Sequence, residues 1–275
     1  MNPGLPQPEL RAAACEALGA TEPRAKCTAV LALSRARCEC ALAVSAHIAA
    51  PDTPGRPSHP ELVHPSRVPR RRLTTPAGRV ALLHAVAHIE FNAINLALDA
   101  IARFPDLPEA YYWDWLGVAE EEARHFMLLE TRLASCNSHY GALPAHDGLW
   151  EAAMKTRHDP LLRMALVPRV LEARGLDVTP ALQARLRAVG DEASADVLSV
   201  ILRDEVGHVA VGDRWYRYLC AQRGCEPEQT FLQLCQRDGA RPPQPPFNLA
   251  ARTEAGFSRE ELAGLEALAL STPRT

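Results

Sequence analysis

The sequence predicts an all-α protein, a bundle of four long helices with additional helices at both ends. Ala and Leu are abundant while aromatic residues make up only 5% of the chain, a composition that favours helix over sheet. No stretch alternates apolar and polar residues as a half-buried strand does. Four long stretches instead carry apolar residues three and four positions apart, which is the spacing of one helix face.

The N-terminal part contains two predicted helices and a proline-rich connection. Residues 8–50 are rich in alanine and are broken near the sequence GATEP. Residues 50–76 contain too many prolines for a helix or a central strand. Within them lies the basic run RVPRRR, residues 67–72. We expect it to be a solvated linker, with a phosphate-binding patch as the alternative.

The first two long helices follow this connection. Thr75 is a candidate N-cap with Pro76 at the first helical position, so a helix is expected over 77–104. The turn PDLP separates it from a second helix over 109–137, and a short helix is expected over 149–156.

The second pair of long helices is less regular. Asp159 is a candidate N-cap for a helix over 160–173, which Pro168 should bend and Gly175 should end. A connecting helix, TPALQARLRAVG, leads to the fourth long helix over 191–222.

The C-terminal part is predicted to be a polar, proline-containing tail that ends in one helix. That helix begins with a capping box in which Ser258 is answered by Glu261. We therefore divide the chain into an N-terminal helical extension (1–60), a bundle (61–222) and a C-terminal helical extension (223–275).

Composition excludes several classes of protein. The net charge of −3 gives no global electrostatic case for binding nucleic acid or a membrane surface. The N-terminus lacks the basic start and apolar stretch of a signal peptide, and no apolar run reaches the roughly 20 residues that span a bilayer. The eight cysteines form no CxxC pair. We expect a cytoplasmic protein with reduced cysteines.

Each of the four long helices places one carboxylate inside its apolar stripe, and two of them add a histidine three residues later. These residues are Glu90, Glu122, His125, Glu172, Glu205 and His208. Glu120 lies on the solvent side, where it can pair with Arg124, and Glu121 lies at the border of the stripe.

Four carboxylates in an apolar core require positive charge, because unpaired ionised carboxylates there are costly and repel one another. Two divalent metal ions supply that charge. Glu-x-x-His places an oxygen and a nitrogen ligand one turn apart, and six protein ligands for two ions leave coordination positions open. Glu90 and Glu122 are 32 residues apart, and Glu172 and Glu205 are 33 apart. One Glu-x-x-His alone is a weak signal, typical of a surface pair or a core histidine. The whole set in phase favours a dinuclear site.

At these residues the sequence resembles the ferritin-like di-iron carboxylate superfamily, in which this ligand set is already known. The resemblance covers about residues 76–222. The segments HAVAHIEFNAINLALD, EEEARHF, YGALPAHDGLW, RMALVPRVLEARGLDV and RDEVGHV are similar to one branch of it, the DUF455 family, over most of the chain.

The resemblance implies a ferritin-like four-helix bundle and a role for each ligand. Glu122 and Glu205 would bridge the metals, Glu90 and Glu172 would each bind one metal, and His125 and His208 would do the same. Glu121 and Asp204 would orient the histidines, with ordinary surface charges as the alternative. His84 and His88 are interpreted as residues of a second layer or of the surface.

Carboxylate and imidazole ligands suit iron, with manganese possible at one or both positions. The leading hypothesis is a di-iron oxidoreductase that uses O2 and an electron donor to hydroxylate or oxidise an unidentified small or nucleic-acid-derived substrate. The tRNA-modifying hydroxylases of the superfamily are the analogy, by fold kinship alone. One alternative is a ferroxidase or iron-handling protein, and another is a non-catalytic bundle stabilised by metal. Nucleic acid as a partner rests on the basic run at 67–72.

Overall fold

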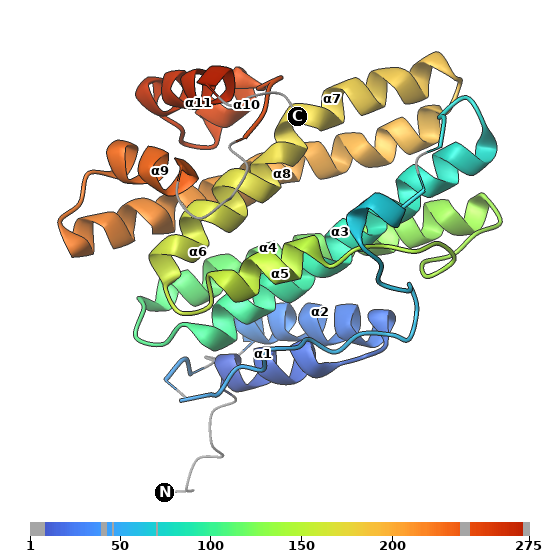
Figure 1. Ribbon diagram of the computed structural model, residues 1–275. Coiled ribbons are helices and arrows are strands. Elements are labelled where there is room, and N and C mark those ends of the chain that lie inside the picture. Colours follow the sequence, from blue (N-terminus) through green and yellow to red (C-terminus); the bar gives the residue numbers. More distant parts are fainter. Residues whose placement is uncertain (1–8, 40–42, 46, 70, 237–242, 272–275) are drawn as a thin grey trace, which may run out of the picture. The chain divides into compact units, whose positions relative to one another are not determined.

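The computed structural model describes residues 9–39, 43–45, 47–69, 71–236 and 243–271 (Figure 1). Over these residues the protein is all-α, as predicted, with two isolated β-bridges and no strand. The chain forms two compact units, Met1–Glu151 and Ala152–Thr275. The division at residues 60 and 222 that the sequence suggests remains a prediction.

The first unit is built on two long helices that pack along each other. Helices α3 and α4 are joined by the short loop 104–108, so they run antiparallel, while α1 packs on α3 and α2 packs on α4. The Thr75 side chain caps α3 by accepting from the Gly78 N–H, which confirms the predicted helix start. The helices of this unit are α1 (Leu10–Gly19), α2 (Pro23–Glu39), the short 3₁₀ helix η1 (Pro65–Arg67), α3 (Pro76–Arg103) and α4 (Glu109–Ser135), with α5 (Gly148–Lys155) at the boundary.

A non-helical segment, residues 47–63, crosses the first unit after α2. The expectation of helix up to residue 50 is therefore wrong for the described residues beyond Glu39. The segment is fixed by a hydrogen bond from the Gly55 N–H to the Leu18 carbonyl at 2.8 Å. Only glycine fits there, since a Cβ on Gly55 would lie 2.1 Å from the Gly19 carbonyl oxygen. The described arginines of the basic run are exposed, as expected of a solvated linker.

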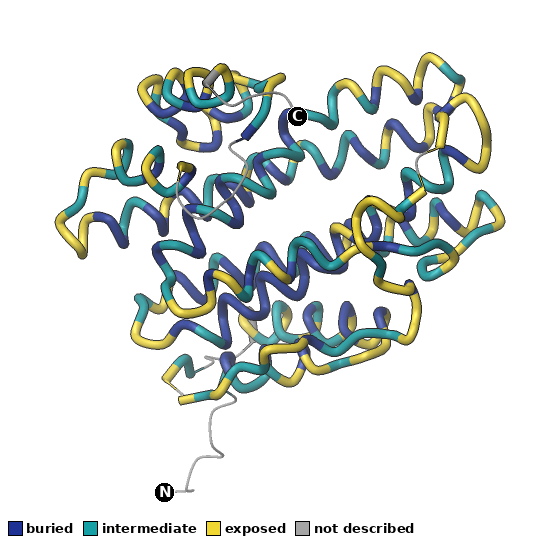
Figure 2. The backbone as a smooth tube through the Cα atoms, in the orientation of Figure 1, coloured by how far each residue is buried: buried dark blue, intermediate teal, exposed yellow. Residues whose placement is uncertain are grey.

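Helix α3 is the most apolar long helix in the described part of the chain. By length and composition alone it could cross a membrane, although polar residues such as Glu90 and Asp99 interrupt its apolar sequence. Its most apolar window is 67% buried inside the protein, and residues 90–102 at its C-terminal half are all buried, in the dark blue of Figure 2. This burial is typical of the core helix of a soluble protein.

In the second unit a continuous helical rod packs along α8. The rod consists of α6, the π-helical segment η2 and α7, and the unit continues with three shorter helices. Asp159 caps α6, as predicted, and Asp191 caps α8 at the predicted start of that helix. The bounds are α6 (Pro160–Leu166), η2 (Val167–Glu172), α7 (Ala173–Ala188), α8 (Glu192–Arg223), α9 (Pro227–Gln236), α10 (Leu249–Glu254) and α11 (Arg259–Ser271).

The prediction that Gly175 ends the third long helix is wrong. Glycine inside a helix costs only about 1 kcal/mol relative to alanine, and the packing of α7 along α8 outweighs that cost. Pro180 also lies inside α7, where it cannot donate to the carbonyl of Leu176. That carbonyl accepts instead from the Asn248 side-chain amide at 3.2 Å, so a residue 72 positions away permits the helix to continue.

The C-terminal tail is more helical than predicted, because α9 and α10 form within it. The capping box of α11 is confirmed. The Ser258 N–H donates to Glu261 Oε2 at 2.8 Å, and the Glu261 N–H donates to Ser258 Oγ at 3.1 Å.

Candidate metal centre

Three predicted ligands meet in the core of the first unit. Glu90 comes from α3, and Glu122 and His125 come from adjacent turns of α4. His125 Nδ1 lies 3.1 Å from Glu90 Oε2 and 3.6 Å from Glu122 Oε2. One ligand atom from each residue lies within 4.8 Å of the others, and all three side chains are buried. The helical phase read from the sequence is therefore correct for this group.

The charge of this group calls for a cation. Burial alone would lower the pKa of His125, but its hydrogen bonds and charge interactions with Glu122 and Glu90 raise that pKa to about 11. A proton on the imidazole is one way to offset two buried carboxylates. A metal ion bound to the same atoms is another, and it would displace that proton.

The second predicted group lies on the rod and on α8 of the second unit. Glu205 and His208 are buried one turn apart on α8, with His208 Nδ1 3.5 Å from Glu205 Oε1. Glu172 is half-buried at the last position of η2. Among the described residues, neither Glu172 nor His208 belongs to a cluster of three or more potential ligands. Their joint ligation stays a prediction.

Glu172 lies in a π-helical segment, whereas the sequence predicted only that Pro168 bends the helix here. Pro168, the second residue of η2, has no N–H to donate, which disturbs the α-helical hydrogen-bond pattern. A π turn adds one residue per turn and so rotates the side chains after it, and such turns are frequent at functional sites. Helix α8 approaches η2 closely here, since a Cβ on Gly212 would lie 2.4 Å from the Pro168 side chain.

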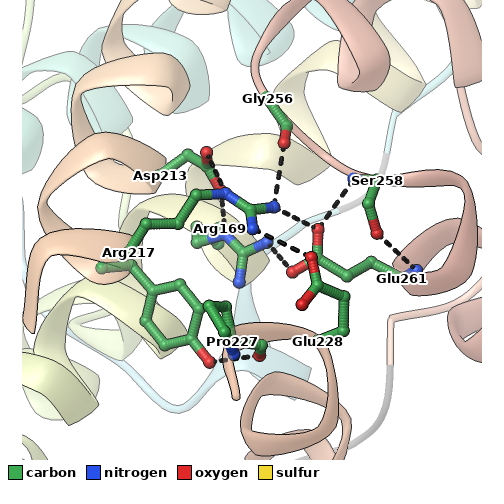
Figure 3. A network of polar contacts seen from close by, with 9 residues as sticks. Arg169, Asp213, Arg217, Pro227, Glu228, Gly256, Ser258 and Glu261 are labelled. Atoms are coloured by element: carbon green, nitrogen blue, oxygen red, sulfur yellow. Dashed lines mark hydrogen bonds and ion pairs between the residues drawn. The ribbon is translucent and has the colours of Figure 1, made fainter. Parts of the chain in front are cut away.

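Arg169, three residues before Glu172, fixes this segment and was missed in the sequence. Its fully buried guanidinium lies 3.0 Å from Asp213 of α8 and 2.5 Å from Glu261 of α11 (Figure 3). Three rings surround it with centroids 3.9–4.6 Å from Cζ, those of Tyr216, Phe231 and Phe257. The sequence feature that could have indicated a buried arginine is its position in the apolar stretch ALVPRVLE.

Arg217 of α8 completes this network at its more exposed side. It binds Asp213 and Glu261 at 2.9 Å each and Glu228 of α9 at 3.0 Å (Figure 3). Two arginines thus share two buried carboxylates, and the C-terminal helices are tied to η2 and α8. The predicted C-terminal extension has a structural role within the second unit.

The remaining acids of the two motifs have separate positions. Arg124 donates a hydrogen bond to Glu120, which confirms the predicted pair, and the Ser34 hydroxyl donates to the other Glu120 oxygen. Glu121 is half-buried on α4. Asp204 accepts from Arg203 Nε at 2.8 Å. Orientation of the histidines by Glu121 and Asp204 stays a prediction.

His84 and His88 are buried in the first unit, so the surface interpretation is excluded. His84 Nε2 accepts from the Gly141 N–H at 3.0 Å. His88 Nδ1 lies 2.9 Å from the Tyr140 hydroxyl, and Nε2 lies 3.0 Å from the His146 carbonyl. Burial lowers the pKa of each histidine to about 4, so both are neutral at pH 7.

The donor set consists of atom types that bind metal ions in proteins. Carboxylate oxygens and imidazole nitrogen suit iron and manganese, and no described cysteine belongs to the cluster as a zinc or copper(I) thiolate site would require. Buried carboxylates within 4.8 Å of an imidazole nitrogen have the spacing of ligands that share one ion. The cluster could therefore hold a metal ion.

Comparison with known proteins gives a family and one relative. The family model described as "Protein of unknown function (DUF455)" matches residues 19–263. An "Uncharacterized protein" of Haemophilus influenzae is 47% identical over 213 residues, which are 75% of this chain and 74% of the relative. No solved structure matches. The match extends over both units and includes all six predicted ligands, and the chain belongs to the DUF455 family.

Proposed function

We propose that this protein is a di-iron oxidoreductase that uses O2 to oxidise or hydroxylate a small or nucleic-acid-derived substrate in the cytoplasm. The observation that carries the proposal is the buried cluster of Glu90, Glu122 and His125, which could hold a metal ion. Two reduced irons would supply two electrons to O2.

The protein's own residues would hold and tune such a centre. Glu90 and Glu122 would bind metal through carboxylate oxygens, and His125 would bind it through an imidazole nitrogen. Glu172, Glu205 and His208 would complete the six-ligand set, which the resemblance to ferritin-like di-iron proteins supports. The apolar helix faces around the cluster would exclude bulk water and so strengthen the electrostatic hold on the ions.

Oxygen consumption by the iron-loaded protein tests this proposal. Full-length protein is loaded with Fe(II) without air and mixed with O2 at an oxygen electrode. We expect O2 uptake that needs Glu122, so Glu122→Ala abolishes it. The matched control is Glu120→Gln on the same helix, which changes a partly exposed acid and leaves the uptake intact.

Three outcomes separate the candidate functions. An oxygenase continues to consume O2 when an electron donor and extracts of small molecules or tRNA are supplied, and a product gains oxygen or loses hydrogen. An iron-handling protein consumes O2 in proportion to added Fe(II) alone. Stable iron binding with no O2 uptake contradicts both and leaves the metal a structural role.

A further inference from the structure

A pocket of about 280 Å³ lies in the first unit between α3, Tyr140 and the non-helical segment 56–62. Its apolar lining includes Phe91 and Tyr140, whose ring centroids are 5.5 Å apart at a 44° tilt, and Pro57 and Pro60 from the segment. At about 30 Å³ per water molecule, the volume corresponds to a ligand of roughly ten non-hydrogen atoms.

The pocket wall is fixed by contacts at both ends of the segment. Arg56 donates two hydrogen bonds to Asp147, at 2.7 and 2.6 Å. The Ala145 N–H donates to the Glu61 carbonyl at 3.0 Å, and the Val63 N–H donates to the Ala145 carbonyl at 2.8 Å. A pocket built on these contacts is formed before a ligand arrives, which reduces the entropy lost on binding. The charge of Arg56 is already offset by Asp147, so the pocket does not demand an anion.

One buried acceptor in the pocket lining has no partner. Asn92 is only 2% exposed, and its Nδ2 donates to the His88 carbonyl at 2.9 Å, which fixes the orientation of the amide. Asn92 Oδ1 then has no hydrogen-bond partner among the described residues. His88 Nδ1 lies against the Tyr140 hydroxyl, and His88 Nε2 lies 3.0 Å from both the His146 carbonyl and Asn92 Nδ2. The imidazole therefore contacts the amide through Nδ2 and supplies no donor to Oδ1. Buried acceptors without a partner are rare, and this one indicates a donor from outside the protein.

The pocket is separate from the candidate metal centre. Asn92 follows Glu90 by two residues, which places its side chain about 200° around the helix from that ligand. A ligand in the pocket would therefore contact the face of α3 that points away from Glu90. Its binding does not depend on the proposed oxidation chemistry.

We propose that this pocket binds an uncharged planar ring that carries an N–H or NH2 donor, of about the size of a free nucleobase. Two aromatic residues, Phe91 and Tyr140, and two prolines in the lining suit a flat ring. Asn92 Oδ1 would accept the hydrogen bond and set the orientation of the ring. The lining combines these apolar residues with polar side chains such as Ser58, His88 and Asn92, and small-molecule sites use such polar groups to fix the orientation of a ligand.

A pair of probes that differ in one group tests the donor requirement. Full-length protein is titrated with 2-aminopyrimidine and with 2-methylpyrimidine, in which a methyl group replaces the NH2 group, by calorimetry and ligand-observed NMR. We expect 2-aminopyrimidine to bind about tenfold more tightly, because the methyl compound leaves the buried acceptor unsatisfied. Equal affinities, or no binding of the amino compound at millimolar concentration, would overturn the proposal.

Two variants locate the binding. Asn92→Leu removes the acceptor at similar volume, so the two probes should then bind equally. Ser58→Tyr introduces a bulky ring from an exposed position of the pocket lining and should block both probes. This second variant does not alter the core, so it keeps the test valid if Asn92→Leu fails to fold. Unchanged binding in Ser58→Tyr would place the probes elsewhere and contradict the assignment.

Discussion

Replacing Arg169 by methionine is expected to destabilise the second unit strongly. Methionine can fill much of the space between the rings of Tyr216, Phe231 and Phe257, so the loss is chiefly electrostatic. In the wild type, Arg169 lies 2.5 Å from Glu261 and 3.0 Å from Asp213, with no exposed side-chain surface. In the variant, Arg217 is the one arginine that still pairs with these two carboxylates in the described part of the chain.

The structure sets the size of this effect. Removing one partner of a buried ion pair costs roughly 3–5 kcal/mol, because the remaining charge is left uncompensated. The matched control is Arg217→Met, which removes contacts to the same two carboxylates from a side chain that is 30% exposed. Because solvent screens the charge of Arg217, we expect Arg217→Met to lower the free energy of unfolding by about 1 kcal/mol.

Urea unfolding followed by circular dichroism measures both costs, and hydrogen exchange of the α11 amides shows whether the loss is local. The account predicts faster exchange in α11 and in the neighbouring η2 segment for Arg169→Met alone. Equal unfolding midpoints for Arg169→Met and Arg217→Met would refute the reasoning, since they would mean that burial of the guanidinium contributes nothing.

Three further predictions concern other parts of the chain. Because the pKa of His125 is raised to about 11, a metal ion that binds its imidazole must displace a proton. Between pH 7 and pH 8 the affinity for Mn²⁺, measured by competition with a chelating dye, should therefore rise about tenfold. An affinity that does not change with pH would contradict this. Lys26→Met should lower the unfolding free energy by about 2 kcal/mol in chemical denaturation, because Nζ donates to the Leu18 and Gly55 carbonyls at 2.9 Å; Lys155→Met, at an exposed position, should change it little. Ser258→Ala should cost about 1 kcal/mol through loss of the α11 cap, and an unchanged thermal midpoint would argue against that role.

The elements that the sequence predicted well carry their signals locally. The cap of α3 by Thr75 and the capping box of Ser258 and Glu261 involve residues at most three positions apart. The burial of Glu122 and His125 followed from their three-residue spacing on one helix face. In each case the determining interaction lies within one turn, which is why the sequence alone revealed it.

The features that the sequence did not reveal depend on distant residues. Helix α7 passes through Gly175 and Pro180 because it packs on α8 and because Asn248 satisfies the carbonyl that the proline leaves. Glu172 is half-buried at the end of a π-helical segment, whose hydrogen-bond pattern the α-helical spacing of the sequence did not predict. The Arg169 network joins residues up to 92 positions apart. No local pattern specifies such contacts.

Iron content of the purified chain tests the central claim most directly. Wild-type protein and the variants Glu122→Ala and Glu120→Gln are loaded with Fe(II) without air, freed of excess metal and analysed by elemental mass spectrometry. We expect about two iron ions per chain in the wild type and in Glu120→Gln, and a loss of iron in Glu122→Ala. Absence of bound iron in the wild type, or equal iron in all three proteins, would contradict it.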